Sequence, residues 1–168
     1  MRMKQPMGNY QPLSIANGFL ELGYRDVVPV DPMKVQKLCY FAHGYYLGAS
    51  KGTPLIRGQF QAWPFGPVNP AIYECFKNYR SSAITDYGKI FSPEQGGMIP
   101  AAAPEDDPLY LNVRDFVWTT YGRKPSMGLS DITHRVGGAW AQTWDSSSSR
   151  SAPIDNDLIR DEFAPLTS

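Results

Sequence analysis

The chain has 168 residues, of which 42% are apolar and 13% aromatic, which is enough for one ordinary domain that folds around its own core without disulfide staples. Sixteen basic residues balance sixteen acidic ones and are scattered along the chain, which disfavours nucleic acid as the main partner. No apolar run follows the basic residues near the N-terminus, so we expect no secretory signal, no membrane span or membrane partner, and a location in the cytoplasm.

Two helices are predicted in the first third of the chain. A hydrophobic residue, a serine cap and apolar residues at helical spacing indicate a short helix over residues 13–23. Asp31 is an N-cap followed by proline, and apolar residues at helical spacing continue from it to Leu47. Because this second stretch is apolar on nearly every face, we expect it to be the buried central helix, with Lys34 and Lys37 on its solvent side.

The pairing of a cap with a following proline recurs twice. Asn69 and Asp107 each precede a proline and a run of apolar residues at helical spacing, and the helix after Asp107 is expected to end at Gly122. A serine-rich stretch over residues 145–153 indicates a flexible connection to a last short helix capped by Asp155. The sequence therefore predicts at least five helices.

Strand signals are fewer. Alternating polar and apolar residues at 59–62 are typical of a short, half-buried strand, and residues 84–90 are the candidate partner. Residues 93–107 combine turn formers with few large apolar groups and indicate a surface loop. We therefore expect a mainly α protein: a single compact helical domain with a central buried helix and a small antiparallel β-sheet.

The stretch from Trp63 to Pro70 is the most unusual in the chain. Before the helix-starting Pro70, two prolines and a glycine fix a rigid bend between the predicted strand and a capped helix, and such a bend displays its aromatic residues in fixed positions. Preorganised aromatic groups carry much of the energy of protein interfaces, so Trp63, Phe65 and Asn69 are candidate partner-binding residues. The alternative is that Trp63 fills the core.

No catalytic, cofactor or metal site is indicated. Cys39, His43, Cys75 and His134 make up a Cys2His2 set, but Cys75 and His134 do not occur in close ligand pairs. Cys39 lies in mid-helix among apolar residues, where nothing would favour a nucleophilic thiolate. We expect both cysteines to be buried thiols, and we interpret Thr133 and His134 as the end of a helix rather than as a polar site.

Three segments resemble the signatures of one family, the Panacea (SocA-like, phage-associated) antitoxin domain. They are KLCYFAHGYYL at 37–47, AWPFGPV at 62–68 followed by a tyrosine, and LSDITH at 129–134 followed by a tryptophan. The matching positions singled out are Lys37, Tyr40, His43, Gly44, Trp63, Gly66, Pro67, Val68, Tyr73, Thr133, His134 and Trp140.

The resemblance implies a domain over residues 13–164, preceded by an N-terminal extension at 1–12. It implies an antitoxin that neutralises a toxin, or a host defence protein if the chain is phage-encoded, by direct binding and without catalysis. The alternatives are an adaptor that delivers a toxin to a protease, with residues 146–149 or an exposed terminus engaging the protease, and a metal- or thiol-dependent enzyme. Some relatives carry a DNA-binding helix-turn-helix domain, for which the dozen residues before the first helix are too few, so operator binding is disfavoured.

Overall fold

A computed structural model describes residues 7–167, so the first six residues of the expected N-terminal extension lie outside it. In chain order the elements are α1 (Pro12–Asp26), α2 (Pro32–Ser50), β1 (Gln61–Trp63), β2 (Gly66–Val68), α3 (Pro70–Phe76), the 3-10 turn η1 (Lys77–Tyr79), β3 (Lys89–Ser92), β4 (Gly97–Pro100), α4 (Pro108–Tyr121), α5 (Ser126–Thr133), α6 (Ala139–Asp145), β5 (Ala152–Pro153), α7 (Asn156–Phe163) and η2 (Ala164–Leu166). The prediction of a mainly α domain with small antiparallel sheets is confirmed. No helix within residues 7–167 is long and apolar enough to cross a membrane.

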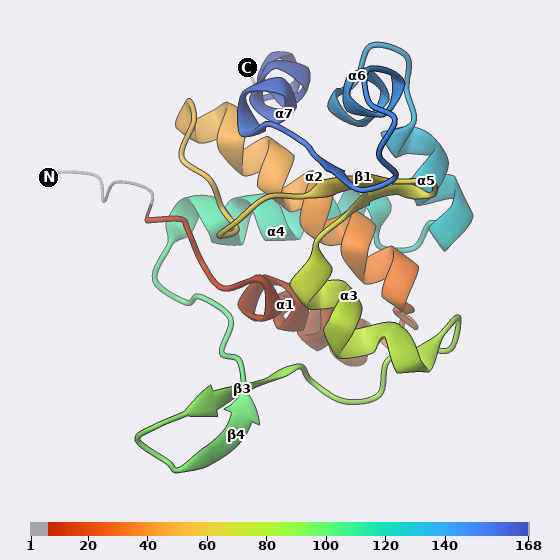
Figure 1. The fold of residues 1–168 in the computed structure, drawn as a ribbon. Coiled ribbons are helices and arrows are strands. Elements are labelled where there is room, and N and C mark those ends of the chain that lie inside the picture. The colour runs from red at the N-terminus through yellow and green to blue at the C-terminus, as the bar shows by residue number, and fades with distance from the viewer. Residues whose placement is uncertain (1–6, 168) are drawn as a thin grey trace, which may run out of the picture.

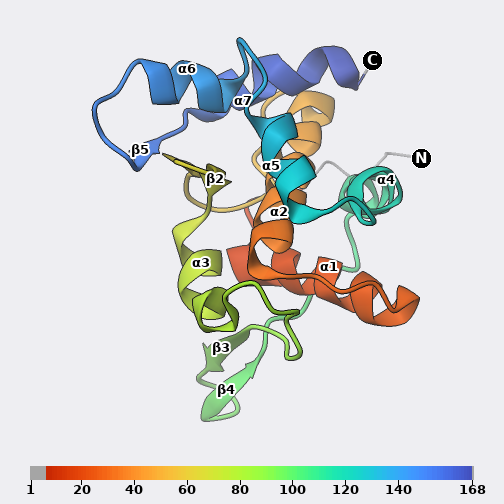
Figure 2. The same ribbon diagram turned by 90° about the vertical axis from the view of Figure 1, so that its right-hand side faces the viewer.

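Helix α2 runs through the middle of the molecule and packs against α1, α3, α4, α5 and α7 (Figure 1, Figure 2). Every residue from Lys34 to Leu47 is buried, so the predicted central helix is confirmed. The expectation that Lys34 and Lys37 mark its solvent side is wrong, because their exposed fractions are 7% and 1%. Each buried ammonium group donates to a backbone carbonyl, Lys34 to Gly122 and Lys37 to Pro67, which offsets part of the cost of removing it from water.

Four of the five predicted helix caps are confirmed; the serine cap expected for the first helix is wrong, because α1 starts at Pro12 and Ser14 lies inside it. The side chains of Asp31, Asn69, Asp107 and Asp155 each accept hydrogen bonds from backbone N–H groups in the first turn of the following helix. These bonds satisfy donors that have no partner inside the helix, and the proline after three of the caps needs none. The cap of α4 is as predicted, and so is its end at Gly122.

Helix α1 is longer at both ends than the sequence indicated. It continues three residues past Gly23 to Asp26, and Val27 ends it in the left-handed region at φ 55°. At its start, Pro12 already lies in the helix, and the preceding Tyr10 forms a bridge with Ile56. The residues just before position 13 therefore belong to the folded structure.

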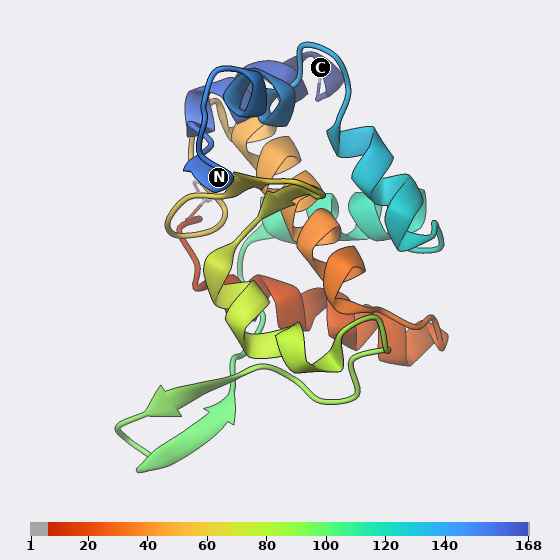
Figure 3. The same cartoon turned by 45° about the vertical axis from the view of Figure 1, so that its right-hand side comes forward.

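The predicted strand pairing is wrong. Strand β1 pairs with β2, directly after it, and on its other edge with β5, which lies in the expected serine-rich connection. Residues 84–90 do not pair with β1, because β3 at their end pairs instead with β4, inside the expected loop at 93–107. Short turns explain the β1–β2 and β3–β4 pairings, since nearby strands lose less entropy on meeting. Hairpin β3–β4 projects away from the helices (Figure 3).

Aromatic rings fill the space between α2 and α7. The ring of Phe163 meets those of Tyr40 and Tyr45 edge-on, with centroids 5.8 and 5.0 Å apart. Gly44 lies on the same part of α2, and a methyl group there would overlap the Phe163 ring. Gly44 therefore lets α7 approach α2 closely, which gives this family-motif residue a packing role.

Replacing Gly44 by alanine is expected to lower the unfolding free energy by about 1–3 kcal/mol, because overpacking outweighs the gain of about 0.5–1 kcal/mol in helix propensity. Gly128→Ala in α5 is the matched control, since the nearest atom to its added methyl lies at an ordinary 3.6 Å. We expect that control to be neutral or stabilising in urea unfolding. Equal effects at the two glycines would show that Phe163 moves aside without cost.

Candidate functional site

The hairpin β1–β2 is held in place through its backbone carbonyl groups. Alternate carbonyls from Trp63 to Asn69 each accept a hydrogen bond from a side chain of a surrounding helix. The pairs are Trp140 Nε1 to Trp63 O (2.8 Å), Ser130 Oγ to Phe65 O (2.6 Å), Lys37 Nζ to Pro67 O (3.0 Å) and Gln36 Nε2 to Asn69 O (3.0 Å). We call residues 61–69 the anchored hairpin.

The three family-like segments meet at the anchored hairpin. The first supplies Lys37 from α2, the second is the hairpin itself, and the third supplies Ser130 from α5, followed by Trp140 in α6. Side-chain donors that take backbone acceptors fix a loop without depending on the loop's own side chains. Segments that lie far apart in the sequence thus converge on one hairpin.

Gly66 is the tightest point of the anchored hairpin. Its φ is +112°, a conformation that side chains rarely adopt, and a methyl group there would lie 2.6 Å from Thr133 Oγ1 and 3.1 Å from Lys37 Cε. Thr133 itself donates to Ser130 O. The glycine is thus required both by backbone conformation and by the closeness of α2 and α5.

The predicted partner-binding residues differ in exposure. Phe65 sits in the turn of the hairpin with 61% of its surface exposed. Trp63 is half-buried; its ring lies 4.8 Å from that of Tyr73 and its Nε1 donates to Gln61, so it lines the surface rather than filling the core. Asn69 is 3% exposed, and its side chain caps α3, so we now assign it an architectural role.

The buried His43 is a structural bridge. Its Nδ1 accepts from the backbone N–H of Ile56, so its Nε2 carries the proton and donates to Asn156 Oδ1 at 2.9 Å. Burial lowers the pKa of His43 to about 4, which keeps the ring neutral. With both nitrogens occupied, His43 ties the loop before β1 and the start of α7 to α2.

His134 and Trp140 form a stack behind the anchored hairpin. Their rings are 4.0 Å apart, and Trp144 extends the stack at 5.3 Å from Trp140. His134 is the residue that ends α5, as the sequence indicated, and burial followed by the nearby Lys37 charge lowers its pKa. The stack supports the indole that holds Trp63 O.

The four cysteines and histidines lie in different surroundings. Cys39 is buried, and burial raises the pKa of its thiol, which disfavours a thiolate. Cys75 is exposed, contrary to expectation, because the seven-residue α3 buries only Ile72 and Phe76. Among residues 7–167 no group of three or more His, Cys, Asp or Glu is placed to hold a metal ion.

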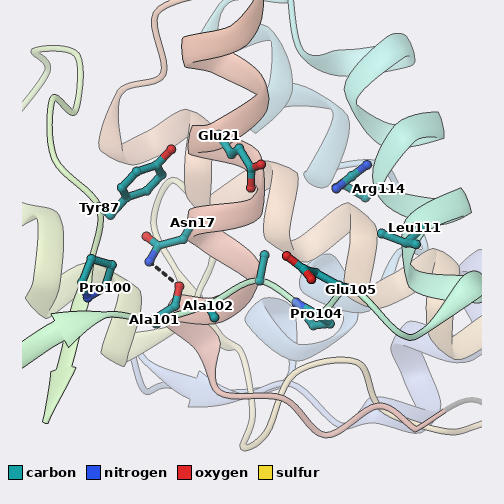
Figure 4. Close-up of a pocket in the computed structure, with 11 residues that line it drawn as sticks. Asn17, Glu21, Tyr87, Pro100, Ala101, Ala102, Pro104, Glu105, Leu111 and Arg114 are labelled. Atoms are coloured by element: carbon teal, nitrogen blue, oxygen red, sulfur yellow. Dashed lines mark hydrogen bonds between the residues drawn. The ribbon is translucent and has the colours of Figure 1, made fainter. Parts of the chain in front are cut away.

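A depression of about 510 Å³ lies between α1, α4 and the base of hairpin β3–β4 (Figure 4). Asn17 faces it, but its side chain is fully used: Nδ2 donates to Gly88 O and Ala101 O, and Oδ1 accepts from Gly88 N. Glu21 and Arg114 lie on opposite walls. Asn17 thus fixes the base of the projecting hairpin.

The family model described as "Antitoxin SocA-like, Panacea domain" matches residues 35–141, nearly two thirds of the chain, and this range contains all three segments that meet at the anchored hairpin. The chain belongs to this family. A relative within it is "Antitoxin SocA" of Caulobacter vibrioides, 34% identical over 127 residues; the aligned region covers 76% of this chain and 66% of the relative, slightly under two thirds. No solved structure is significantly similar to the chain.

The Panacea family carries an antitoxin description. Most of the motif positions singled out in the sequence are buried, whereas Trp63, Tyr73 and His134 are partly or fully exposed. Sequence reasoning missed Gln36, whose amide contacts the backbone of Asn69 through both its oxygen and its nitrogen. No local pattern identifies Gln36, because its partner lies 33 residues away.

Proposed function

We propose that this chain is a cytoplasmic antitoxin that neutralises a partner toxin, or a host defence protein if it is phage-encoded, by direct binding and without catalysis. The observation that carries the proposal is the anchored hairpin. Donors from three helices fix its carbonyls, yet Phe65 at its turn is 61% exposed. A large apolar side chain on a rigid support is typical of an interface anchor, because little entropy is lost when it binds.

Replacing Phe65 by alanine is expected to weaken binding of the partner by about 2 kcal/mol, roughly 30-fold in Kd, while thermal unfolding stays unchanged. The fold should be unaffected because the side chain is mostly exposed and only its backbone is anchored. Isothermal titration calorimetry with the purified partner measures the affinity. Phe91→Ala is the matched control, since Phe91 is 62% exposed on the projecting hairpin. Weakening by the Phe91 variant alone would move the interface to β3–β4.

The proposal as a whole is tested by expressing the adjacent open reading frame with and without this chain. Rescue of growth together with a stable co-purified complex supports direct neutralisation. Rescue accompanied by loss of the partner protein favours the adaptor alternative, in which a protease removes the toxin. Toxicity that this chain does not relieve, with no complex formed, contradicts both.

A further inference from the structure

A small apolar pocket opens beside the anchored hairpin. Its volume is about 220 Å³, below the roughly 300–1,000 Å³ of cavities that enclose a drug-sized ligand or cofactor, and suited to one large side chain. The residues that line it come from α2, the anchored hairpin, α3 and the segment after η1. The apolar and aromatic ones include Met33, Trp63, Phe65, Val68, Ile72 and Tyr73.

Lys37 lines this pocket and is only 1% exposed. Its ammonium group has three N–H donors, and within the described structure it makes one hydrogen bond, to Pro67 O. Burying a cation is costly unless its donors are satisfied, so the remaining two mark a place for an acceptor. A group that combines an apolar part with a hydrogen-bond acceptor would pack against the apolar lining and accept hydrogen bonds from the ammonium.

Both charged residues that line the pocket are cations. Arg80 is the second cation in its lining; its backbone is in the left-handed region at φ 56°, and its side chain makes no ion pair within residues 7–167. No aspartate or glutamate of the described residues lines the pocket. The pocket is therefore complementary to an apolar group that carries a negative charge.

We propose that this pocket receives a large apolar side chain of the partner protein that lies next to a carboxylate, with the carboxylate accepting hydrogen bonds from Lys37. This inference rests on the proposed function and specifies what the partner presents to the anchored hairpin. Lys37 then has two roles: one donor fixes Pro67, and the others face the partner. Arg80 attracts the same charge from the rim.

The test uses two small probes that share one apolar body, N-acetyl-phenylalanine and its amide, because neither requires that the toxin be known. Burial lowers the pKa of Lys37 to about 7, so titrations at pH 6 keep its ammonium protonated. Nuclear magnetic resonance of the full chain follows the Trp63 indole N–H and the signals of Tyr73. We expect the acid to bind roughly tenfold tighter than the amide, because a charge-assisted hydrogen bond is stronger than a neutral one.

Lys37→Met should remove the preference for the acid and weaken binding of the partner protein by roughly tenfold or more. Lys34→Met is the matched control: Lys34 is also buried in α2 and also donates to a carbonyl, that of Gly122, but it does not line the pocket. The control should keep both the acid preference and the partner affinity. Thermal unfolding of each variant reports whether it is folded.

Equal binding of acid and amide to the wild-type chain, or no binding of either, would overturn the inference even if Lys37→Met failed to fold. So would a folded Lys37→Met variant with unchanged partner affinity. Failure of the proposed function looks different, because the wild-type chain would then not relieve toxicity at all. If the wild-type chain neutralises its partner but does not distinguish the probes, the partner does not insert an apolar side chain next to a carboxylate into this pocket.

Discussion

Replacing Asp107 by alanine is expected to lower the unfolding free energy by about 3–5 kcal/mol, the largest loss we predict for a single substitution. The side chain is 2% exposed and accepts hydrogen bonds from Tyr46 Oη (2.7 Å), Tyr10 Oη (2.9 Å) and the backbone N–H of Tyr110. Its removal costs about 1 kcal/mol for the lost helix cap and about 1–2 kcal/mol for each phenol left without an acceptor. Urea unfolding at neutral pH measures the loss.

Asp155→Ala is the control that separates the cap from the buried network, because Asp155 is exposed and caps α7 through Asp157 N–H alone. We expect it to cost only about 1 kcal/mol. A similar loss at both positions would mean that the two phenols find other partners in the Asp107 variant.

The contribution of Asp107 should also depend on pH. Burial alone would raise its pKa, but hydrogen bonds from Tyr46, Tyr110 N–H and Tyr10 outweigh burial and hold the pKa below the ordinary value of 3.8. A lowered native pKa supplies stability above the unfolded value that is lost as pH falls through the native one. The unfolding free energies of wild type and variant should therefore converge in acid, starting below about pH 4.

Gly66→Ala is expected to cost about 3 kcal/mol, because backbone strain and overpacking each contribute about 1–2 kcal/mol. The φ of +112° is unfavourable for alanine, and its methyl group would press on Thr133 and Lys37. Because those two residues hold the hairpin, we also expect binding of the partner to weaken. Denaturant unfolding and calorimetry on the same sample report both effects.

Gly58→Ala separates strain from contact, since Gly58 has a similar φ of +85° but no atom within 4 Å of the added methyl. It should show the strain alone and leave partner binding unchanged. If Gly66→Ala lowered the unfolding free energy no more than Gly58→Ala, the close contact of the added methyl group with α2 and α5 would contribute nothing to the cost.

The sequence predicted those parts of the fold that depend on neighbouring residues. Caps such as Asp31 and Asn69 act on N–H groups two or three positions away, so their pattern is visible locally. The burial of Lys34 was not visible, because its acceptor, Gly122 O, lies 88 residues along the chain. Hairpin β3–β4 was missed although its pairing is local, because neither strand buries a side chain and the turn formers after residue 92 indicated a loop.

The candidate site was predicted in pieces. The bend and its exposed Phe65 followed from two prolines and a glycine, and the resemblance identified the segments that supply Lys37 and Trp140. That these segments meet at one hairpin could not be predicted, since their targets are backbone carbonyls, which are present in every residue. The assignment of Asn69 to partner binding shows the limit of residue type as a signal, because asparagine occurs both at helix caps and in interfaces.

Anchorage through carbonyl groups makes the tip of the hairpin interchangeable in composition. Pro64 and Phe65 are both exposed. The hydrogen bond that joins this turn to α5 is accepted by Phe65 O rather than by a side chain. Substitutions at position 65 can therefore change the displayed side chain while the backbone of the turn stays fixed. A library randomised at position 65 should yield folded variants with new binding preferences, so this scaffold can be retargeted at its tip alone.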